Sequence, residues 1–267
     1  MTEITDDINN IDAIEEKPYK AVHFEWLLPI WIHPQRTLKE IALQERAVWL
    51  LPLLLLTAMA LVNVLFSGPA RASAVQVVEP PAENMQYYTP EQVTQFEQSA
   101  SQSRGPLFIY IFPAALAVGG VWISWILLGS LLHFALTISG SRNSHVMTLN
   151  LVSWCSLPLV LRFVVQSFYT LISGHVIQAQ GLSGFVAAAG MLDAFINGLL
   201  AQMDIYGLGL LALMLLGVPL FSHLTRQKSW AAALISLLVM MGLTTIPGLI
   251  GAQLNGLSGG SGMIPFF

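Results

Sequence analysis

A single arginine lies in the middle of an otherwise apolar stretch, WCSLPLVLRFVVQSF, at residues 154–168. Its guanidinium, that of Arg162, stays charged and carries five N–H donors, so it needs acceptors around it. A charged arginine at the centre of a membrane helix costs about 2.5–3.5 kcal/mol on insertion scales, and it normally faces the bundle interior or a wet cavity. We therefore expect Arg162 to face the interior of a helix bundle.

Two kinds of acceptor are candidate partners for this arginine. One is a carboxylate: Asp204 begins a later apolar run, and Asp193 interrupts the apolar segment 183–201 that precedes it. The other is a main-chain carbonyl, because Pro158 has no N–H and leaves the carbonyl of Trp154 without its helical donor. The sequence leaves three interpretations open: a buried structural contact, a functional polar site, or a helix boundary that lies nearer Arg162 than the pattern indicates.

A second stretch whose residues could carry out a reaction is GLSG, residues 181–184, which resembles the Gly-x-Ser-Gly nucleophile loop of rhomboid proteases. A serine nucleophile needs a histidine base within about 3 Å, whereas His145 and His223 are expected at the opposite face of the membrane from Ser183. We interpret GLSG as a turn of small residues. The histidines have no metal-ligand spacing and no phosphate-binding loop is present, so we predict no catalytic, cofactor-binding or metal site.

The composition identifies the elements that must hold these residues. The chain is 55% hydrophobic and only 10% charged, whereas soluble domains have about a quarter of their residues charged. A helix needs about 20 apolar residues to cross roughly 30 Å of hydrocarbon. The apolar runs predict an all-α integral membrane protein, a bundle of five transmembrane helices, with crossings at about 48–67, 107–138, 146–173, 203–222 and 230–250.

The polar segments divide the rest of the chain. Residues 1–22 are acidic and poor in apolar side chains, which predicts a disordered tail. Residues 23–252 are expected to form one membrane domain with an outer loop at 68–106, and 253–267 to form a flexible Gly/Ser-rich tail. The dipeptide Gly68-Pro69 is expected to end the first crossing. The second run is longer than one crossing needs, so we expect either a tilted helix or a break near Pro113 or Gly119-Gly120.

The segment 183–201 is ambiguous, because Asp193 and Asn197 interrupt its apolar face. It can be an interfacial helix, a re-entrant helix or a sixth crossing. A sixth crossing would move Arg226 and Lys228 to the outer side, against the tendency of Lys and Arg to stay on the cytoplasmic side.

We therefore predict five crossings in the cytoplasmic (inner) cell membrane. The N-terminus is then cytoplasmic and the C-terminus extracytoplasmic. Of the Lys and Arg residues in the polar segments, only Arg71 and Arg104 then lie on the outer side.

Ahead of the first crossing, FEWLLPIWIHPQRTLKEIALQER predicts an amphipathic surface helix that begins at Pro34. Leu38, Ile41 and Ala42 share its apolar face, which is typical of a helix lying on the inner membrane surface. The alternative is a solvated helix packed on its own bundle. The expected membrane-surface contacts are Trp26, Trp31, Arg36, Lys39 and Arg46.

Three stretches of the chain together resemble segments of the Yip domain family of Ypt-interacting proteins, and in particular its bacterial branch. The resemblance covers roughly residues 31–250. WIHPQRTLKEI resembles the His-Pro-x-x-Thr segment before the first crossing, LVSWCSLPLVL the Tyr-Ser-Leu-x-Pro-like segment of the third, and the run from MDIYG to WAAAL the fourth crossing with its basic turn. The family-like positions are His33, Pro34, Thr37, Pro158 and Asp204.

The resemblance implies a five-helix membrane protein without known chemistry. Eukaryotic relatives act in vesicle traffic, and some bacterial relatives accompany ABC-type exporters. The acidic motifs near the start of the eukaryotic domain are absent from this sequence, so binding of Rab-type GTPases is not carried over.

We therefore expect a non-enzymatic membrane interaction or scaffold protein without a cofactor. Its expected partners are the lipid bilayer and another membrane protein, with an ABC-type exporter as one candidate, and no nucleic acid. The alternative is a small transporter or channel component with a polar intramembrane site at Arg162, because intramembrane charge and helices broken by proline are marks of that class.

Overall fold

The computed structural model describes residues 22–74, 89–91, 94, 105–186 and 190–257, and every element in these ranges is a helix. Five of its helices are long and apolar enough to cross a membrane, namely Leu50–Ser73, Leu107–Ile138, His145–Ser173, Ile205–Ser222 and Arg226–Ile250. The prediction of an all-α membrane bundle with five transmembrane helices is thus confirmed. Nearly all of the predicted N-terminal tail, most of the loop 68–106 and residues 258–267 lie outside the described residues. Residues 253–257 of the predicted flexible C-terminal tail are instead the last residues of a helix, Arg226–Leu257.

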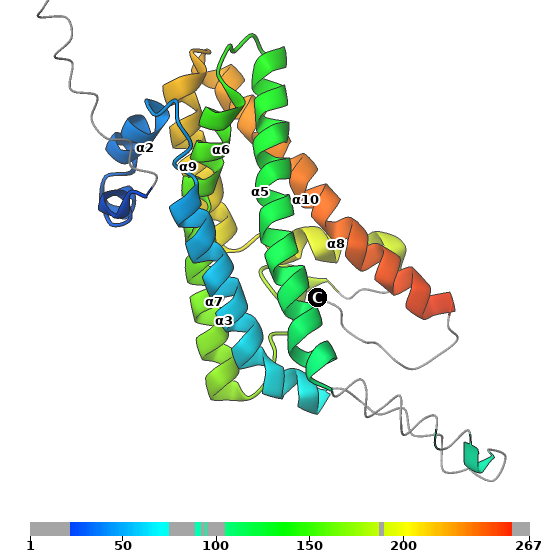
Figure 1. Cartoon of the computed structure of the whole chain (residues 1–267). Coiled ribbons are helices and arrows are strands. Elements are labelled where there is room, and N and C mark those ends of the chain that lie inside the picture. Colours follow the sequence, from blue (N-terminus) through cyan, green and yellow to red (C-terminus); the bar gives the residue numbers. More distant parts are fainter. Residues whose placement is uncertain (1–21, 75–88, 92–93, 95–104, 187–189, 258–267) are drawn as a thin grey trace, which may run out of the picture.

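The long helices stand side by side, and most of them run along a common direction (Figure 1). They are α3 (Leu50–Ala74), α5 (Phe112–Ile138), the pair α6 (His145–Cys155) and α7 (Leu157–Ser173), α9 (Ile205–Ser222) and α10 (Arg226–Leu257). Helix α3 packs along α7, and α5 packs on α3, α6 and α10. Towards its C-terminal end α10 diverges from the bundle and is accompanied there by the short helix α8 (Met191–Gln202) (Figure 1).

The first crossing does not end where the sequence indicated. Helix α3 continues through Gly68-Pro69 to Ala74, so the expected stop at this dipeptide is wrong. Gly68 lies against the ring of Tyr110, and a Cβ at this position would overlap that ring. Gly68 therefore serves close packing between α3 and the π-helical turn η3 (Leu107–Ile111) that precedes α5.

Prolines mark the starts of two other helices. Pro113 lies in the first turn of α5, next to η3, whereas Gly119 and Gly120 lie within α5 without a break. In the third crossing Pro158 lies in the first turn of α7, and α6 ends at Cys155 just before it. Proline fits a first helical turn because the N–H that it lacks would have no partner there.

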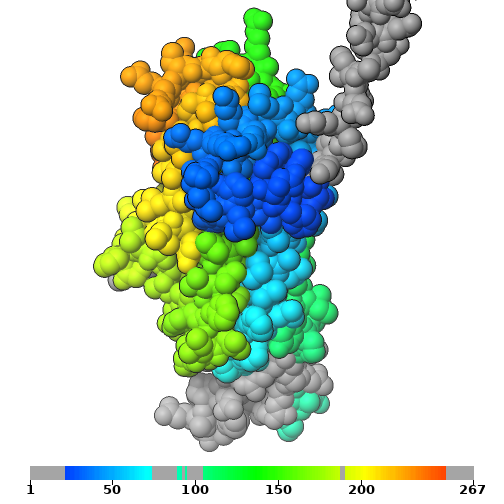
Figure 2. Space-filling model, turned by 90° about the vertical axis from the view of Figure 1, so that its left-hand side faces the viewer, coloured from blue at the N-terminus to red at the C-terminus, as the bar shows by residue number. Residues whose placement is uncertain are grey.

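The N-terminal segment lies against the flank of the bundle, where it covers parts of several helices (Figure 2). It comprises the short turns η1 (Phe24–Trp26) and α1 (Pro29–Ile32) and the amphipathic helix α2 (Pro34–Ala42). The apolar face of α2 is buried against α9 and α6. The sequence allowed this apolar face to lie on the membrane surface or to pack on the bundle itself, and in the structure it packs on the bundle.

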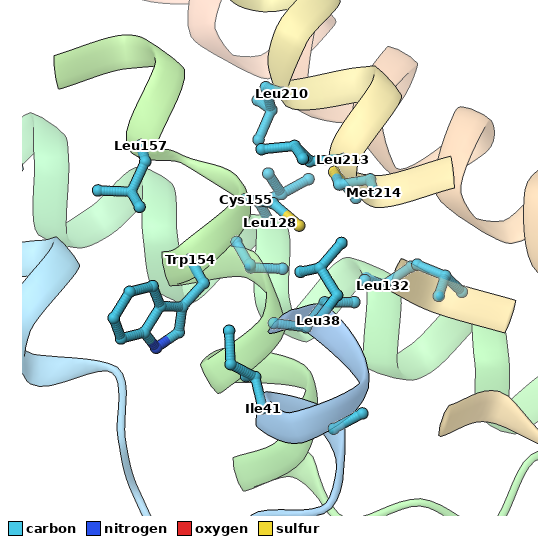
Figure 3. Close-up of a cluster of buried hydrophobic side chains, with 14 of the residues drawn as sticks. Leu38, Ile41, Leu128, Leu132, Trp154, Cys155, Leu157, Leu210, Leu213 and Met214 are labelled. Carbon is cyan, nitrogen blue, oxygen red and sulfur yellow. The ribbon is translucent and has the colours of Figure 1, made fainter. Parts of the chain in front are cut away.

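The core lies where α2 meets the long helices (Figure 3). Leu38 and Ile41 of α2 contribute to one buried cluster with Leu132 of α5, Trp154 of α6 and Met214 of α9, each at most 1% exposed. The single cysteine, Cys155, belongs to the same cluster and is fully buried.

A polar clamp ties the chain between α2 and α3 to this core. The side-chain oxygen of Asn150 accepts the N–H of Val48 (2.9 Å), and its amide donates to the carbonyl of Arg46 (2.8 Å). The indole N–H of Trp154 donates to the carbonyl of Val48 (3.0 Å). Asn150 and Trp154 are both completely buried, so their polar atoms are satisfied by protein.

Candidate functional site: a polar junction at Arg162

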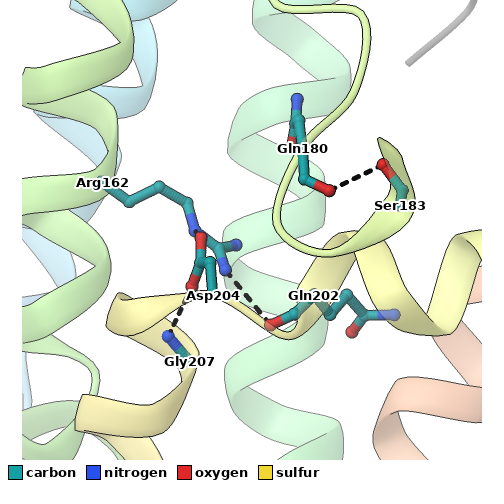
Figure 4. Close-up of polar contacts among 6 residues, drawn as sticks. All are labelled: Arg162, Gln180, Ser183, Gln202, Asp204 and Gly207. Carbon is teal, nitrogen blue, oxygen red and sulfur yellow. Dashed lines mark hydrogen bonds and ion pairs between the residues drawn. The ribbon is translucent and has the colours of Figure 1, made fainter. Parts of the chain in front are cut away.

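The structure brings Arg162 and Asp204 together at a junction between three helices (Figure 4). Arg162 projects from α7, and its Nε lies 2.7 Å from Oδ2 of Asp204, which precedes α9. The Nε–H does not point at an acceptor, so the contact is an ion pair rather than an aligned hydrogen bond. The two side chains are 19% and 17% exposed, which means that the pair is shielded but not sealed.

Asp204 also contacts the first turn of α9. Its Oδ1 accepts the backbone N–H of Gly207 at 2.7 Å, so Asp204 is the N-cap of α9. Aspartate suits this position because its oxygen satisfies one of the free N–H groups of the first turn and its charge opposes the helix dipole. A Cβ on Gly207 would press against the carbonyl of Gln202, so glycine allows this tight turn.

The second partner of Arg162 is a main-chain carbonyl, but not one near Pro158. Nη2 donates to the carbonyl of Gln202 over a long 3.5 Å, at the C-terminal end of α8. Free carbonyls make the C-terminal end of a helix partially negative, which favours a cation there. Within the described residues these two contacts are the whole set for Arg162, and the carbonyl of Trp154 is not among them.

Gln202 also joins the junction to α10, and sequence reasoning missed it. Its side-chain amide donates to the carbonyl of Met241 (3.1 Å), and its oxygen accepts the hydroxyl of Thr244 (2.9 Å). Gly198, one turn earlier on α8, lies against Thr245, where a Cβ would be 2.9 Å from the threonine methyl. The only signal in the sequence was a glutamine two positions before the candidate Asp204, which by itself indicates nothing.

A non-helical segment returns from the end of α7 to this junction. Gly181 has a positive φ of 55° and lies against the last carbonyls of α8, and the N–H of Leu182 donates to the carbonyl of Leu200 (2.9 Å). Asn197 of α8 donates to the carbonyls of Ser183 (3.1 Å) and Val186 (3.0 Å). These contacts hold the segment against α8.

The interpretation of GLSG as a turn agrees with this geometry. Ser183 is buried in the short helical turn η4 (Ser183–Phe185), and its hydroxyl donates to the carbonyl of Gln180 (2.7 Å) (Figure 4). Asn197 interrupts the apolar pattern of α8 because its amide is needed for this turn.

Asp193, the other candidate carboxylate, is not part of the junction. It lies in the first turn of α8, roughly 13 Å along the helix from the end that meets Arg162. It has no ion pair among the described residues. Its place in the first turn suits the positive end of that helix.

The family-like positions ahead of the first crossing form the start of α2. Pro34 lies in its first turn, and the hydroxyl of Thr37 donates to the carbonyl of His33 (3.2 Å). Pro158 lies against Gly209 of α9, where a Cβ would be 3.1 Å from its ring, so this pair allows α7 and α9 to approach closely.

One of the expected membrane-surface contacts is contradicted. Trp26 is only 7% exposed and packs edge-on against Trp154, with ring centroids 5.4 Å apart, so it faces the protein rather than lipid. An amphipathic pattern shows that a face is apolar but not whether protein or lipid covers it. Trp31 is 47% exposed, and the side chains of Arg36, Lys39 and Arg46 are exposed as well.

Two of the histidines, which are far apart in the sequence, come together. The rings of His133 on α5 and His145 on α6 lie with centroids 5.1 Å apart, and Nε2 of His145 lies 3.3 Å from the hydroxyl of Ser130. The part of the chain that the structure describes contains no group of three or more His, Cys, Asp or Glu side chains that could hold a metal ion.

Comparison with known proteins agrees with the helical arrangement. The family model of the Yip1 domain matches residues 29–247, from α1 to the C-terminal part of α10. No curated protein and no solved structure matches the chain. The match covers most of the chain and includes α1 and α2, the first four long helices, most of α10 and the Arg162 junction. The chain therefore belongs to the Yip1 domain family of membrane proteins.

Proposed function

We propose that this Yip1-family membrane protein acts without enzymatic activity, as a scaffold or accessory subunit that binds another membrane protein. The observation that carries the proposal is the outer face of the N-terminal segment. Large apolar side chains are exposed along it, outside the five long helices: Phe24, Leu28, Trp31, Ile32 and Leu43. An apolar patch outside the spanning helices marks a protein or membrane interaction surface.

The charges of the segment favour a protein as the occupant of this patch. The basic side chains Arg36, Lys39 and Arg46 are balanced by the acidic side chains Glu25, Glu40 and Glu45. Arg36 is further paired with Glu40 at 3.3 Å. A surface that binds mainly to anionic headgroups has an excess of Lys and Arg, which this segment does not have. An apolar patch with mixed charges around it is the composition of a protein interface.

The resemblance of the chain to the bacterial branch of the family suggests which partner protein to look for. A transmembrane subunit of an ABC-type exporter in the cytoplasmic membrane is the first candidate partner. With the N-terminus in the cytoplasm, as the positive-inside rule favours, the patch lies on the cytoplasmic side.

The test is a photo-crosslinking amino acid at Leu28, compared with one at Ile172 on α7. Both side chains are strongly exposed, at 74% and 84%, but only Leu28 lies in the patch. We expect Leu28 to give one discrete protein adduct in native membranes, with the exporter subunit identified in it, and Ile172 to give lipid adducts. The double variant Leu28→Ala/Ile32→Ala should lose the complex in mild detergent. Equal lipid adducts at both positions, with no protein adduct, would contradict the proposal.

A second candidate function has its own observation. Helix α8 ends and α9 begins next to Arg162, so two helix ends of opposite partial charge meet at an ion pair. Broken helices whose ends meet at an intramembrane polar site are the usual form of a transporter substrate site. This favours a small transporter or channel component as the alternative.

Flux measurements in liposomes test the alternative. The purified chain should move a small polar solute or ion, and Arg162→Leu should abolish the flux. Asp204→Asn, which keeps the N-cap acceptor but removes the charge, is the matched variant. Absence of flux for a panel of ions and small polar solutes would remove this candidate and leave the docking proposal standing.

A further inference from the structure

The Arg162 junction lies deep within the bundle. Arg162 precedes Ser173, the last residue of α7, by about eleven residues, which is about 16 Å along the helix axis. Because Asp204 contacts Arg162, the break between α8 and α9 lies at the same depth. The hydrogen bond from Leu182 to Leu200 places part of the non-helical segment near this depth too.

Hydrocarbon extends past this depth towards the end of α7. Asn63 of α3 contacts Ser167, and Gly68 contacts Tyr110, so the ends of α3, η3 and α7 lie at one level. Large apolar side chains are exposed around that level on all three elements: Leu65, Phe66, Leu107, Phe108, Ile111, Phe168, Leu171 and Ile172. An apolar surface of this kind on three neighbouring elements fits lipid tails and not water.

The segment 174–186, which is non-helical apart from the short turn η4, passes through this zone with much of its chain exposed. Gln178, Gln180 and Gly181 are exposed, and the helix α8 that holds the segment has no buried residue in the described structure. Irregular backbone at membrane depth is stable only where protein buries it or where it borders water, since lipid offers no hydrogen bonds. The bundle leaves much of this segment exposed, so the second condition applies to the exposed part.

The open N–H donors of the Arg162 guanidinium are a second argument for water at this depth. Its Nε is buried against Asp204, its Nη2 has one long contact of 3.5 Å, and among the described residues Nη1 has no partner. A permanently charged group with so many donors open is stable at this depth only if water supplies the missing acceptors.

We propose that a water-filled vestibule enters the membrane domain from the C-terminal end of α7, is bordered by residues 174–186, and reaches the Arg162–Asp204 pair. This goes beyond the docking function and does not depend on it. It also bears on the transporter alternative, but water can enter such a vestibule with or without solute flux, so the two tests can fail separately.

Cysteine labelling tests the vestibule with little background, because the single native cysteine, Cys155, is fully buried. The full-length protein in lipid nanodiscs is treated with a charged thiol reagent that does not enter lipid. The vestibule variants are Gln178→Cys and Gln180→Cys. The matched variants Leu161→Cys and Phe168→Cys share an exposed face of α7 and bracket Arg162 in depth.

We expect Gln180→Cys to react at least about tenfold faster than Leu161→Cys and Phe168→Cys, because these reagents attack the thiolate, which needs water around it. Fast labelling at all four positions would show that this end of the bundle lies outside the hydrocarbon and would overturn the proposal. Labelling at 178 and 180 as slow as at the two α7 positions would overturn it as well, since no water would then reach the segment. Unchanged thermal stability of each variant shows that the fold is retained.

Discussion

Two polar centres of this molecule are built in opposite ways. At the clamp, Asn150 and Trp154 are fully buried, and three of their hydrogen bonds, 2.8–3.0 Å long, go to the chain between α2 and α3. At the junction, Arg162 and Asp204 are partly exposed, and the arginine has one ion pair and one long hydrogen bond. A satisfied polar group in a dry core holds a structure together, whereas charged groups with open donors need water or a ligand. The comparison separates a structural device from a candidate functional site.

The largest effect is expected at the clamp. Asn150→Leu removes the acceptor of the Val48 N–H and a donor to the Arg46 carbonyl, both in a fully buried site, and should lower the free energy of unfolding by about 3 kcal/mol. Trp154→Phe is the matched variant: it keeps an aromatic ring against Trp26 but loses the bond to Val48, and should cost about 1 kcal/mol. Thermal or denaturant unfolding in mild detergent measures both. A loss at Asn150 no larger than that of the exposed variant Lys39→Ala would contradict the structural role of the clamp.

The next effect is expected at the junction. Arg162→Leu and Asp204→Leu should each lower the free energy of unfolding by about 1–3 kcal/mol, because each leaves the other charge unpaired at depth. The double variant should lose less than the sum, with a coupling energy of about 0.5–3 kcal/mol.

The variant Asp204→Asn separates the two tasks of this residue. Asparagine caps a helix as well as aspartate does, so this variant should lose the ion pair and keep the start of α9. If the losses of the two leucine variants simply add, the pair is not energetically coupled, and only the carbonyl of Gln202 remains as a partner of Arg162.

A smaller and more local effect is expected where the junction meets α10. Gln202→Leu removes the bonds to Met241 and Thr244, and should lower stability by about 1 kcal/mol. Its clearer sign is faster amide exchange in α8 with unchanged exchange in α3, since α8 has no buried residue and opens locally. Thr244→Val is the matched variant, which removes one of the two bonds. Equal acceleration in α3 and α8 would show that the bridge supports the whole bundle.

The smallest effect is expected on the outer face of the N-terminal segment. Trp31 is 47% exposed, so Trp31→Ala should change the free energy of unfolding by no more than about 0.5 kcal/mol. A loss as large as that of Asn150→Leu would mean that the exposed patch is part of the fold rather than a free surface.

Both centres differ also in how well the sequence predicts them. The five long helices follow from hydropathy, because only apolar runs of sufficient length fit hydrocarbon. Arg162 stands out for the same reason, since its charge is anomalous in such a run. The sequence also placed Asp204 at the start of the next long helix, where a carboxylate favours helix initiation.

The clamp left no comparable signal. Asn150 bonds to backbone groups near Val48, which are present at every position of a chain, so no side-chain pattern marks the partner. The sequence predicts Leu38 on an apolar face and Trp26 at the membrane surface, but the choice between lipid and protein depends on the fold around them. Gln202 was missed because its partners lie on α10, roughly forty residues further along the chain.

Amide exchange in lipid nanodiscs compares the two centres most directly. The N–H groups of Val48 and Leu182 lie outside regular helices, and each donates one hydrogen bond of 2.9 Å. One belongs to the dry clamp and the other to the segment that borders the proposed vestibule. We predict slow exchange in peptides that contain Val48 and fast exchange in peptides that contain residues 180–186, although the latter lie at the depth of Arg162. Protection of residues 180–186 as strong as that of Val48 would contradict the contrast between a dry clamp and a hydrated junction.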